Sequence, residues 1–272
     1  MVFSVLRLGI RIVIISLFFC CNALKANEKL INQRIDICEG DSEFPPYMYY
    51  ERIDGERTNK VVGYSVDVLK KILVDENGAE LYSYLPPWKR CLQYVSLGKY
   101  DIAPNSVYSE KRSKAYIMTV PYYSVTPSYF FVKSRFKHGP NIKIPEDYNN
   151  YIVCGLQGYE YNKYGVDQSI LDTKASDFEQ LFNMLRYQRC DIVLARIEPV
   201  LGFKLIGVDL LKSDVVYKES PLSEKSFFHM LISKKLNNRQ ELKNILDEGI
   251  NKMKEDKSIN KILKKYMDIN PE

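Results

Sequence analysis

The chain has 272 residues, of which 46% are hydrophobic, 27% charged and 12% aromatic, and its formal net charge is +5. This composition excludes a disordered or fibrous protein, and no repeat of solenoid length is present. The length suits one large domain or two modest ones, and we expect two.

The first 26 residues differ from the rest of the chain. Arg7 and Arg11 precede the apolar run IVIISLFFCC, and the small residues of NALKA follow it. This order predicts a secretory signal peptide over residues 1–26, because the apolar run is too short for a stable membrane span. An uncleaved anchor is the alternative, since Lys25 lies in the cleavage region. Cleavage would leave a charge of +2, which is not the footprint of a nucleic-acid-binding protein.

Four cysteines follow this segment: Cys38, Cys91, Cys154 and Cys190. Their spacing matches no metal-binding motif and the two histidines lie far apart, so neither a metal site nor a cofactor is expected. In an exported protein the even number permits two disulfides, for which Cys38 with Cys91 and Cys154 with Cys190 is one pairing. The sequence does not fix the connectivity, and buried free thiols fit it equally well.

Apolar runs alternate with segments of helical period along the first half. We expect strands at RIDIC (34–38), ELYSYL (80–85) and YDIAP (100–104). Helices are expected at 64–78, which ends at a glycine, and at 88–98, which follows two prolines. This alternation predicts βαβ units and mostly parallel sheets.

A second series of the same kind begins near Lys133. It contains the predicted strands YIVCG (151–155) and CDIVLA (190–195), with an amphipathic helix at 177–188 between them. GKYDIAPN in the first half and QRCDIVLAR in the second end similar helix-to-strand units. Two similar α/β lobes are therefore expected, and the helical tail at 239–267 needs a lobe to pack against.

Polar and aromatic clusters follow three of the predicted strands: GDSEFPPYMYY, PNSVYSEKR and GLQGYE. In open α/β sheets, ligands bind beyond the carboxyl ends of the parallel strands. Two lobes whose strand ends face each other would hold a small ligand in the cleft between them.

Five stretches, in order, resemble the extracellular solute-binding proteins of family 3, the polar amino acid type: GDSEFPPYMYYE, VGYSVDVLKKIL, LPPWKRCLQYVSLGKYDIAPNSVYSEKR, VPYY and INKILKKYM. The resemblance covers nearly all of the chain after the signal peptide and implies the two-lobed, type II periplasmic binding fold. Lobe 1 would comprise residues 27–131 and 228–272, and lobe 2 residues 132–227. PSYFFV (127–132) and SFFHML (226–231) would be the hinge strands.

The resemblance also implies a ligand site, made by Asp41, Phe44, Trp88, Asn105, Val107, Arg112, Gly158, Tyr159, Glu160 and Arg196. Asp41 would contact the ligand's polar end, and Phe44 and Trp88 would cover its opposite faces. Asn105 and Val107 would offer backbone groups. From the residues alone, the two aromatic side chains are more often core, and the aspartate often caps a turn.

Arg112 stands in the first turn of a helix that is expected just after the third strand. Without the resemblance, a solvated surface charge is the more frequent role of such an arginine. A guanidinium group pairs bidentately with a carboxylate, and a helix N-terminus adds amide donors. We therefore expect Arg112 to anchor a carboxylate of the ligand.

Arg196 departs from the family pattern. Members that bind ordinary α-amino acids carry an aspartate for the α-ammonium group five residues after the position matched by Asp191. An arginine about 4 Å from an ammonium group would cost on the order of 4 kcal/mol at an effective dielectric constant near 20. Unless Glu160 or Glu198 takes over this role, or Arg196 points away from the ligand, we expect a ligand that bears a second acidic group or lacks the amine.

The expected function is that of a monomeric periplasmic solute-binding protein without catalytic activity. It would capture a small carboxylate-bearing ligand, an amino acid or a similar compound, and deliver it to an inner-membrane ABC permease. One alternative is a ligand sensor for a membrane receptor. Another is a dehydratase-like enzyme that uses cleft carboxylates such as Asp41 and Glu160, although no nucleophile motif is present.

Overall fold

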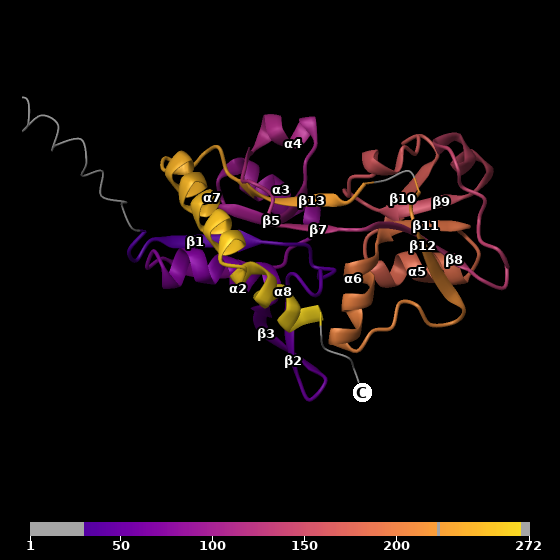
Figure 1. The fold of residues 1–272 in the computed structure, drawn as a ribbon, viewed down its shortest axis with the longest axis horizontal. Helices are drawn as coiled ribbons and strands as arrows, with labels where there is room; N and C mark the ends of the chain where they lie inside the picture. The colour runs from indigo at the N-terminus through magenta and orange to yellow at the C-terminus, as the bar shows by residue number, and fades with distance from the viewer. Residues whose placement is uncertain (1–29, 222–223, 268–272) are drawn as a thin grey trace, which may run out of the picture.

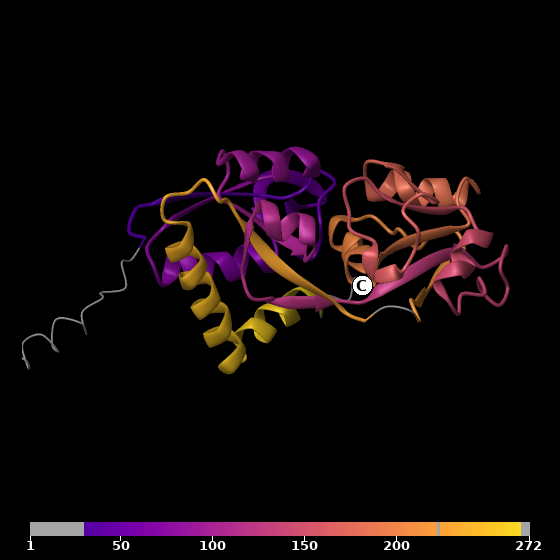
Figure 2. The same ribbon diagram turned by 90° about the horizontal axis from the view of Figure 1, so that it is seen from above.

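The structure, a computed structural model, describes residues 30–221 and 224–267, so the predicted signal peptide lies outside the described residues. Two α/β lobes lie side by side and are joined by segments that pass between them (Figures 1 and 2). The prediction of a two-lobed α/β fold is confirmed. None of the helices in the described ranges is long and apolar enough to cross a membrane.

The first lobe contains a six-stranded sheet and most of the helices. Its strands are β1 (Arg34–Cys38), β4 (Glu80–Tyr84), β5 (Ile102–Val107), β6 (Ile117–Met118), β7 (Tyr123–Val125) and β13 (Ser226–Ile232). Its α-helices are α2 (Tyr64–Leu69), α3 (Trp88–Leu97), α4 (Glu110–Ala115), α7 (Arg239–Glu255) and α8 (Ser258–Met267). A separate hairpin is formed by β2 (Tyr49–Ile53) and β3 (Glu56–Val62). The strand order is β4-β1-β5-β13-β6, with β7 paired to β13.

The second lobe contains a five-stranded sheet in the order β10-β9-β11-β8-β12. Its strands are β8 (Pro127–Val132), β9 (Val153–Leu156), β10 (Leu171–Ala175), β11 (Ile192–Arg196) and β12 (Val215–Glu219). Its α-helices are α5 (Phe178–Arg186) and α6 (Ile197–Gly202), and its 3-10 helices are η2 (Pro145–Asn150), η3 (Asn162–Tyr164) and η4 (Phe203–Ile206).

Both sheets are mixed, with parallel pairs in the βαβ units and antiparallel pairs elsewhere. In the first sheet β1 is parallel to β4 and β5, and in the second β9 is parallel to β10 and β11. In contrast, β13 is antiparallel to β5, and β8 is antiparallel to β11. The reason is connectivity: a strand that arrives from the other lobe starts at the cleft, whereas the parallel strands end there.

The chain crosses between the lobes at Thr126, between β7 and β8, and again between β12 and β13. The strand β8, placed mostly in lobe 1 by the sequence, pairs with strands of the second sheet, and β13 pairs within the first. The two crossings lie together, because Ser226 pairs with Val125. The lobe boundaries and the hinge motion stay predictions.

Local sequence signals place the helices near the site. The helix α3 follows Pro87 and ends at Gly98, which has the left-handed φ of 75° that glycine tolerates best. Asp177 accepts a hydrogen bond from the backbone N–H of Gln180 and so caps α5. The helix predicted at 64–78 is α-helical only as far as Leu69 and continues as a π-helix, η1 (Lys70–Asp75). The apolar spacing did not reveal this wider turn.

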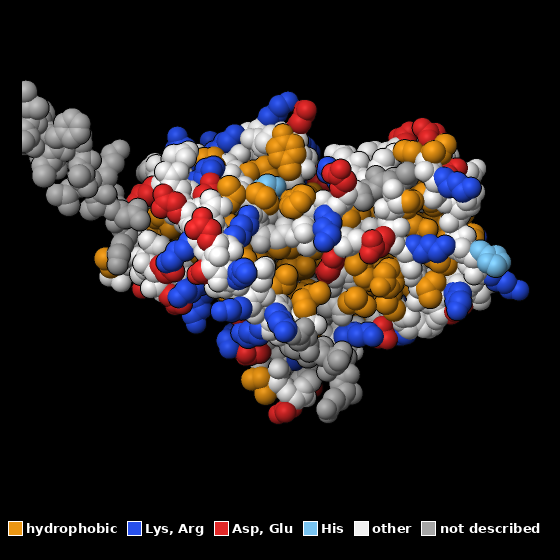
Figure 3. All heavy atoms as spheres, in the orientation of Figure 1, with side chains coloured by type: hydrophobic (Ala, Val, Ile, Leu, Met, Phe, Trp, Pro, Cys, Tyr) orange, Lys and Arg blue, Asp and Glu red, His pale blue; other side chains and the backbone are white. Residues whose placement is uncertain are grey.

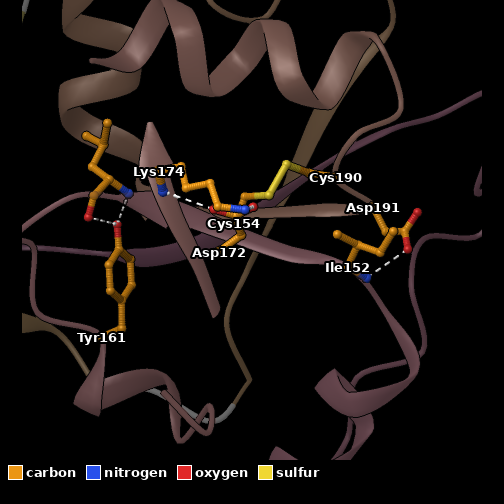
Figure 4. The surroundings of a disulfide bond; sticks show 8 residues. Ile152, Cys154, Tyr161, Asp172, Lys174, Cys190 and Asp191 are labelled. Carbon is orange, nitrogen blue, oxygen red and sulfur yellow. Dashed lines mark hydrogen bonds and ion pairs between the residues drawn. A yellow bond between two sulfur atoms is a disulfide. The ribbon is translucent and has the colours of Figure 1, made fainter. Parts of the chain in front are cut away.

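Two disulfides form with the pairing considered from the sequence, so the cysteines are not free thiols. Cys38 at the end of β1 is bonded to Cys91 of α3. Cys154 of β9 is bonded to Cys190, just before β11 (Figure 4). On the face shown in Figure 3, acidic and basic side chains are interspersed, as expected for a surface whose charge identifies no partner.

Candidate functional site

The carboxyl ends of β1 and β5 in the first lobe face those of β9 and β11 in the second. Side chains just beyond these ends enclose a small cavity of about 20 Å³ between the lobes. It is lined by Glu39, Phe44, Trp88, Val107, Arg112, Tyr159, Glu160, Arg196 and Phe228. The structure thus brings together seven of the ten residues predicted for the site, and adds Glu39 and Phe228.

Arg112 lies at the centre of this junction and is only 6% exposed. Its Nη1 donates to the carbonyl oxygen of Val107 at 3.2 Å, and its Nη2 donates to that of Gly158 in the other lobe at 3.3 Å. The nearest carboxylate is that of Glu160, whose Oε1 is 3.9 Å from the Arg112 Nε. Burial lowers the pKa of Arg112 despite this carboxylate. The side chain is therefore a desolvated cation that contacts both lobes.

Arg196, at the end of β11, is also buried, with 4% exposure. Its Nη2 donates to the backbone carbonyl oxygen of Glu160 at 2.7 Å, while its buried Nε has no hydrogen-bond partner. Its guanidinium carbon lies 5.9 Å and 5.8 Å from the ring centres of Tyr161 and Tyr164. Among the described residues, no carboxylate forms an ion pair with it. The cavity therefore has two buried guanidinium groups in its wall.

Glu39 was missed by the sequence analysis. It is 3% exposed, and its two oxygens accept hydrogen bonds from the backbone N–H of Gly40 and from Nδ2 of Asn105, at 2.8 Å and 2.7 Å. Burial raises the pKa of Glu39 to about 7, and these hydrogen bonds and Arg112 oppose the increase. A signal was present, because Glu39 directly follows the predicted strand RIDIC, where a ligand is expected.

Asp41, which was predicted to contact the ligand, is exposed and does not line the small cavity. It lies instead in a wider groove of about 610 Å³, together with Trp88 and with Gln157 and Asp177 of the second lobe. Asn105 is buried, and its Oδ1 accepts hydrogen bonds from three hydroxyl groups, those of Ser65, Tyr122 and Tyr123. Asn105 therefore holds Glu39 in place from behind the cavity wall.

Aromatic rings form the apolar part of the cavity. The rings of Phe44 and Phe228 are stacked with centres 5.9 Å apart, and Tyr159 meets Phe44 edge-on at 6.4 Å. Trp88 is half-buried, and its Nε1 donates to the carbonyl oxygen of Gly158 at 3.3 Å. This bond joins the two lobes, as does the bond from Arg112 to the same oxygen.

The loop of residues 158–160 brings the second lobe to the cavity. Gly158 has a φ of 81°, which turns its carbonyl oxygen toward Trp88 and Arg112. The Glu160 carboxylate accepts hydrogen bonds from Ser109 across the cleft and from Asn162, each at 3.3 Å. The carboxylate is thus bonded within both lobes, and Glu160 contacts Arg196 through its backbone carbonyl oxygen.

Glu198, the other acid considered near Arg196, is engaged elsewhere. Its carboxylate accepts hydrogen bonds from the backbone N–H and the hydroxyl group of Thr126, each at 2.9 Å. These bonds fix Thr126, where the chain first crosses between the lobes. Neither of the acids proposed from the sequence compensates the charge of Arg196.

The lobes are closely packed around the site. A cavity of about 20 Å³ accommodates roughly one water molecule, and a neighbouring one beside Arg196 has about 10 Å³. A ligand of several carbon atoms enters only if the lobes separate. No group of three or more His, Cys, Asp or Glu side chains in the described part of the chain is arranged to hold a metal ion.

Solved structures with the same fold include several binding proteins. A histidine kinase sensor domain similar to periplasmic binding proteins has a TM-score of 0.71 and 18% identity, with 87% of this chain and 97% of that chain covered. An amino acid ABC transporter substrate-binding protein from Streptococcus pneumoniae, bound to L-arginine, has a TM-score of 0.70 and 20% identity, with 90% and 97% covered. An ancestral amino-acid-binding protein, a precursor of cyclohexadienyl dehydratase, has a TM-score of 0.66 and 16% identity, with 86% and 95% covered.

These identities are low, so the structural similarities establish the fold alone. No curated protein matches the chain in sequence. Residues 37–269 match the family described as bacterial extracellular solute-binding proteins, family 3, which is most of the chain. The chain therefore belongs to the bacterial extracellular solute-binding proteins of family 3.

Proposed function

We propose that this protein is a periplasmic binding protein that closes its two lobes around a small, carboxylate-bearing ligand. The observation that carries the proposal is the position of Arg112. It is 6% exposed, it lines a cavity formed by both lobes, and it donates hydrogen bonds to a carbonyl oxygen of each lobe. A guanidinium fork pairs bidentately with a carboxylate, the anionic group that small metabolites such as amino acids carry.

The walls of the cavity support the same ligand class. Phe44, Trp88, Tyr159 and Phe228 provide apolar contact, and two arginines and two glutamates provide charged groups. Most ligand sites combine an apolar lining with a few polar groups that fix the ligand's orientation. When the lobes separate, the bonds of Gly158 to Trp88 and Arg112 break, and Arg112 becomes free to bind a carboxylate.

The ligand-bound, closed form would then dock on an inner-membrane ABC permease. A membrane sensor is the alternative partner, and the fold similarity to a histidine kinase sensor domain favours it as the second candidate. Export through the predicted signal peptide would place the protein in the periplasm, where two disulfides are stable.

An enzyme is a further candidate, because the Glu39 and Glu160 carboxyl groups line the same cavity. The raised pKa of Glu39, about 7, suits a general acid or base. Asp41, named with Glu160 for this role from the sequence, lies outside the cavity.

The test is a thermal-shift and calorimetric screen of the purified protein against amino acids, dicarboxylates and monocarboxylates. A ligand at about one hundred times its dissociation constant stabilises the native state by about 2.7 kcal/mol, which raises the melting temperature by several degrees. Each compound that binds is then incubated with the protein and recovered. Unchanged recovery supports a binding protein, conversion supports the enzyme, and no binding by a correctly folded protein would overturn the proposal.

A further inference from the structure

We propose that Arg196 is a second anion-binding group in the cleft, so that the ligand is a small organic dianion held between Arg112 and Arg196. This inference rests on the proposed binding function and specifies the ligand class. It differs from a general preference for carboxylates because it assigns a distinct partner to each end of the ligand.

The first support is the incomplete bonding of Arg196. The side chain is 4% exposed, and its Nη2 donates a hydrogen bond to the carbonyl oxygen of Glu160. Its Nε is buried without a hydrogen bond. A buried charge is strongly disfavoured unless it is paired and hydrogen-bonded. An anionic ligand group at the cavity side would supply both the missing charge and the missing acceptor.

The second support is that the described part of the chain provides no substitute for that anion. The Glu160 carboxylate is bonded to Ser109 and Asn162, and the Glu198 carboxylate is bonded to Thr126. The rings of Tyr161 and Tyr164 lie 5.9 Å and 5.8 Å from the guanidinium carbon, and their cation–π attraction supplies neither a full negative charge nor a hydrogen-bond acceptor for Nε.

The third support is the charge of the cavity wall as a whole. Arg112 and Arg196 line the same cavity, and the charge of Arg196 acts on Arg112 strongly enough to help lower its pKa. Of the two acids in the wall, Glu160 lies 3.9 Å from Arg112, and Glu39 is only partly ionised at neutral pH because burial raises its pKa to about 7. The wall therefore keeps a net positive charge, and Arg196 is the cation in it that no described carboxylate pairs.

The same geometry discriminates against neutral amino acids. An α-ammonium group placed about 4 Å from Arg196 would lower affinity by a factor of roughly a thousand at an effective dielectric constant near 20. An anionic group at that position gains attraction instead. The charge of the ligand group that lies next to Arg196 thus determines which ligands bind tightly.

The test compares three probes of similar size: glutarate, which is a dianion, glutamate, which adds an ammonium group, and glutamine, which is a neutral zwitterion. Each is titrated calorimetrically into the wild-type protein, Arg196→Gln, Arg196→Lys and the control Arg189→Gln. Arg189 is exposed in the second lobe, so its substitution removes the same charge outside the cleft.

We expect the wild type to bind glutarate at least about a hundredfold more tightly than glutamine. Arg196→Gln should weaken glutarate binding by about ten- to a hundredfold and leave glutamine binding unchanged or improved. Arg196→Lys should restore part of the glutarate affinity. Arg189→Gln should change neither the glutarate affinity nor the glutamine affinity. If Arg196 only supports the fold, the variant will melt at a lower temperature but keep the wild-type ranking of the probes.

Three results separate this inference from the function on which it rests. Tighter binding of glutamine than of glutarate would overturn the dianion assignment and leave the binding function intact. If Arg196→Gln binds the three probes in the wild-type order of affinity, the dianion assignment is likewise wrong and the binding function stands. If a folded protein binds none of the three probes nor any monocarboxylate, both the proposed function and this inference are wrong.

Discussion

Gly202 at the end of α6 lies directly against the backbone of Pro45 in the other lobe. A Cβ atom at position 202 would stand 2.4 Å from the Pro45 carbonyl oxygen and 2.7 Å from the Pro46 nitrogen. Both obstacles are backbone atoms, which do not move aside as a flexible side chain does. The lobes therefore approach this closely only because residue 202 has no side chain.

Gly202→Ala is expected to prevent full closure and to weaken ligand binding. Overpacking of this kind typically costs about 1–3 kcal/mol, which corresponds to roughly a ten- to hundredfold loss of affinity. Calorimetric titration with the tightest carboxylate of the screen measures the loss, and small-angle scattering should show no compaction on binding. Lys204→Ala, in the exposed turn that follows, is the control. Wild-type affinity and compaction in Gly202→Ala would mean that closure does not require this contact.

Arg112 is expected to be essential for binding, and its geometry as well as its charge should matter. Arg112→Gln removes the cation and should reduce affinity at least about a hundredfold, because a charge-assisted bidentate pair is lost. Arg112→Lys keeps the charge but not the planar fork, so it should bind with intermediate affinity. Lys111→Gln, at the exposed neighbouring position, controls for net charge. Equal affinities of Arg112→Lys and the wild type would argue against bidentate recognition.

Much of the fold could be predicted because the signals for single strands and helices agree with the order in which those elements build the two lobes. The apolar strands, the prolines before α3 and the glycine after it, and the repeated helix-to-strand units all indicated two α/β lobes. The antiparallel course of β8 and β13 was not predicted, because it depends on which lobe each strand comes from. Apolar periodicity likewise does not distinguish an α-helix from the π-helical continuation of α2.

The sequence was informative for residue types with one common role in ligand binding, such as arginine. It was less informative where the fold decides which of several neighbouring polar side chains faces the cavity. Arg112 and Arg196 both line the cavity between the lobes, and their role in ligand binding stays a prediction. Asp41 was predicted and Glu39 was missed, although the two lie only two residues apart, because the course of the chain beyond a strand end cannot be read from the sequence. The role of Asn105 in holding Glu39 depends on contacts with Tyr122 and Tyr123, which no short motif reveals.

Glu39 should make the stability of the protein depend on pH. Its pKa rises from an ordinary value of 4.5 to about 7 on folding, chiefly because burial disfavours the charged form. An acid whose pKa is raised in the folded state binds more protons when folded, so the free energy of unfolding falls as pH increases from about 4.5 to about 7. The total loss is on the order of 3 kcal/mol, and above that range it stays constant.

Glu39→Gln isolates this contribution, since glutamine does not titrate. The difference in free energy of unfolding between the wild type and Glu39→Gln, measured with urea from pH 4 to pH 8, should shift in favour of the variant between about pH 4.5 and pH 7 and then level off. The variant also places an amide donor against Nδ2 of Asn105 or the N–H of Gly40, which lowers its stability by a similar amount at every pH. Glu110→Gln, which is exposed, serves as the control. A difference that does not change with pH would show that Glu39 titrates normally in the folded protein.

The two disulfides should differ in their effect on ligand binding. Cys38 precedes Glu39 and Cys91 belongs to the helix that begins with Trp88, so this bond links two walls of the cavity. The bond between Cys154 and Cys190 joins β9 to the segment just before β11, near Ile152 and Asp191 (Figure 4), and neither cysteine lines the cavity.

The bonds close loops of 53 and 36 residues, and the chain-entropy relation gives each a stabilisation of about 4 kcal/mol. The double variants Cys38→Ser with Cys91→Ser, and Cys154→Ser with Cys190→Ser, should therefore lose similar stability in urea unfolding. Only the first should also bind the carboxylate ligand more weakly, by about tenfold, whereas the second should stay within about threefold of the wild type. If both variants bind with wild-type affinity, the bond between Cys38 and Cys91 stabilises the lobe but does not position Glu39 and Trp88.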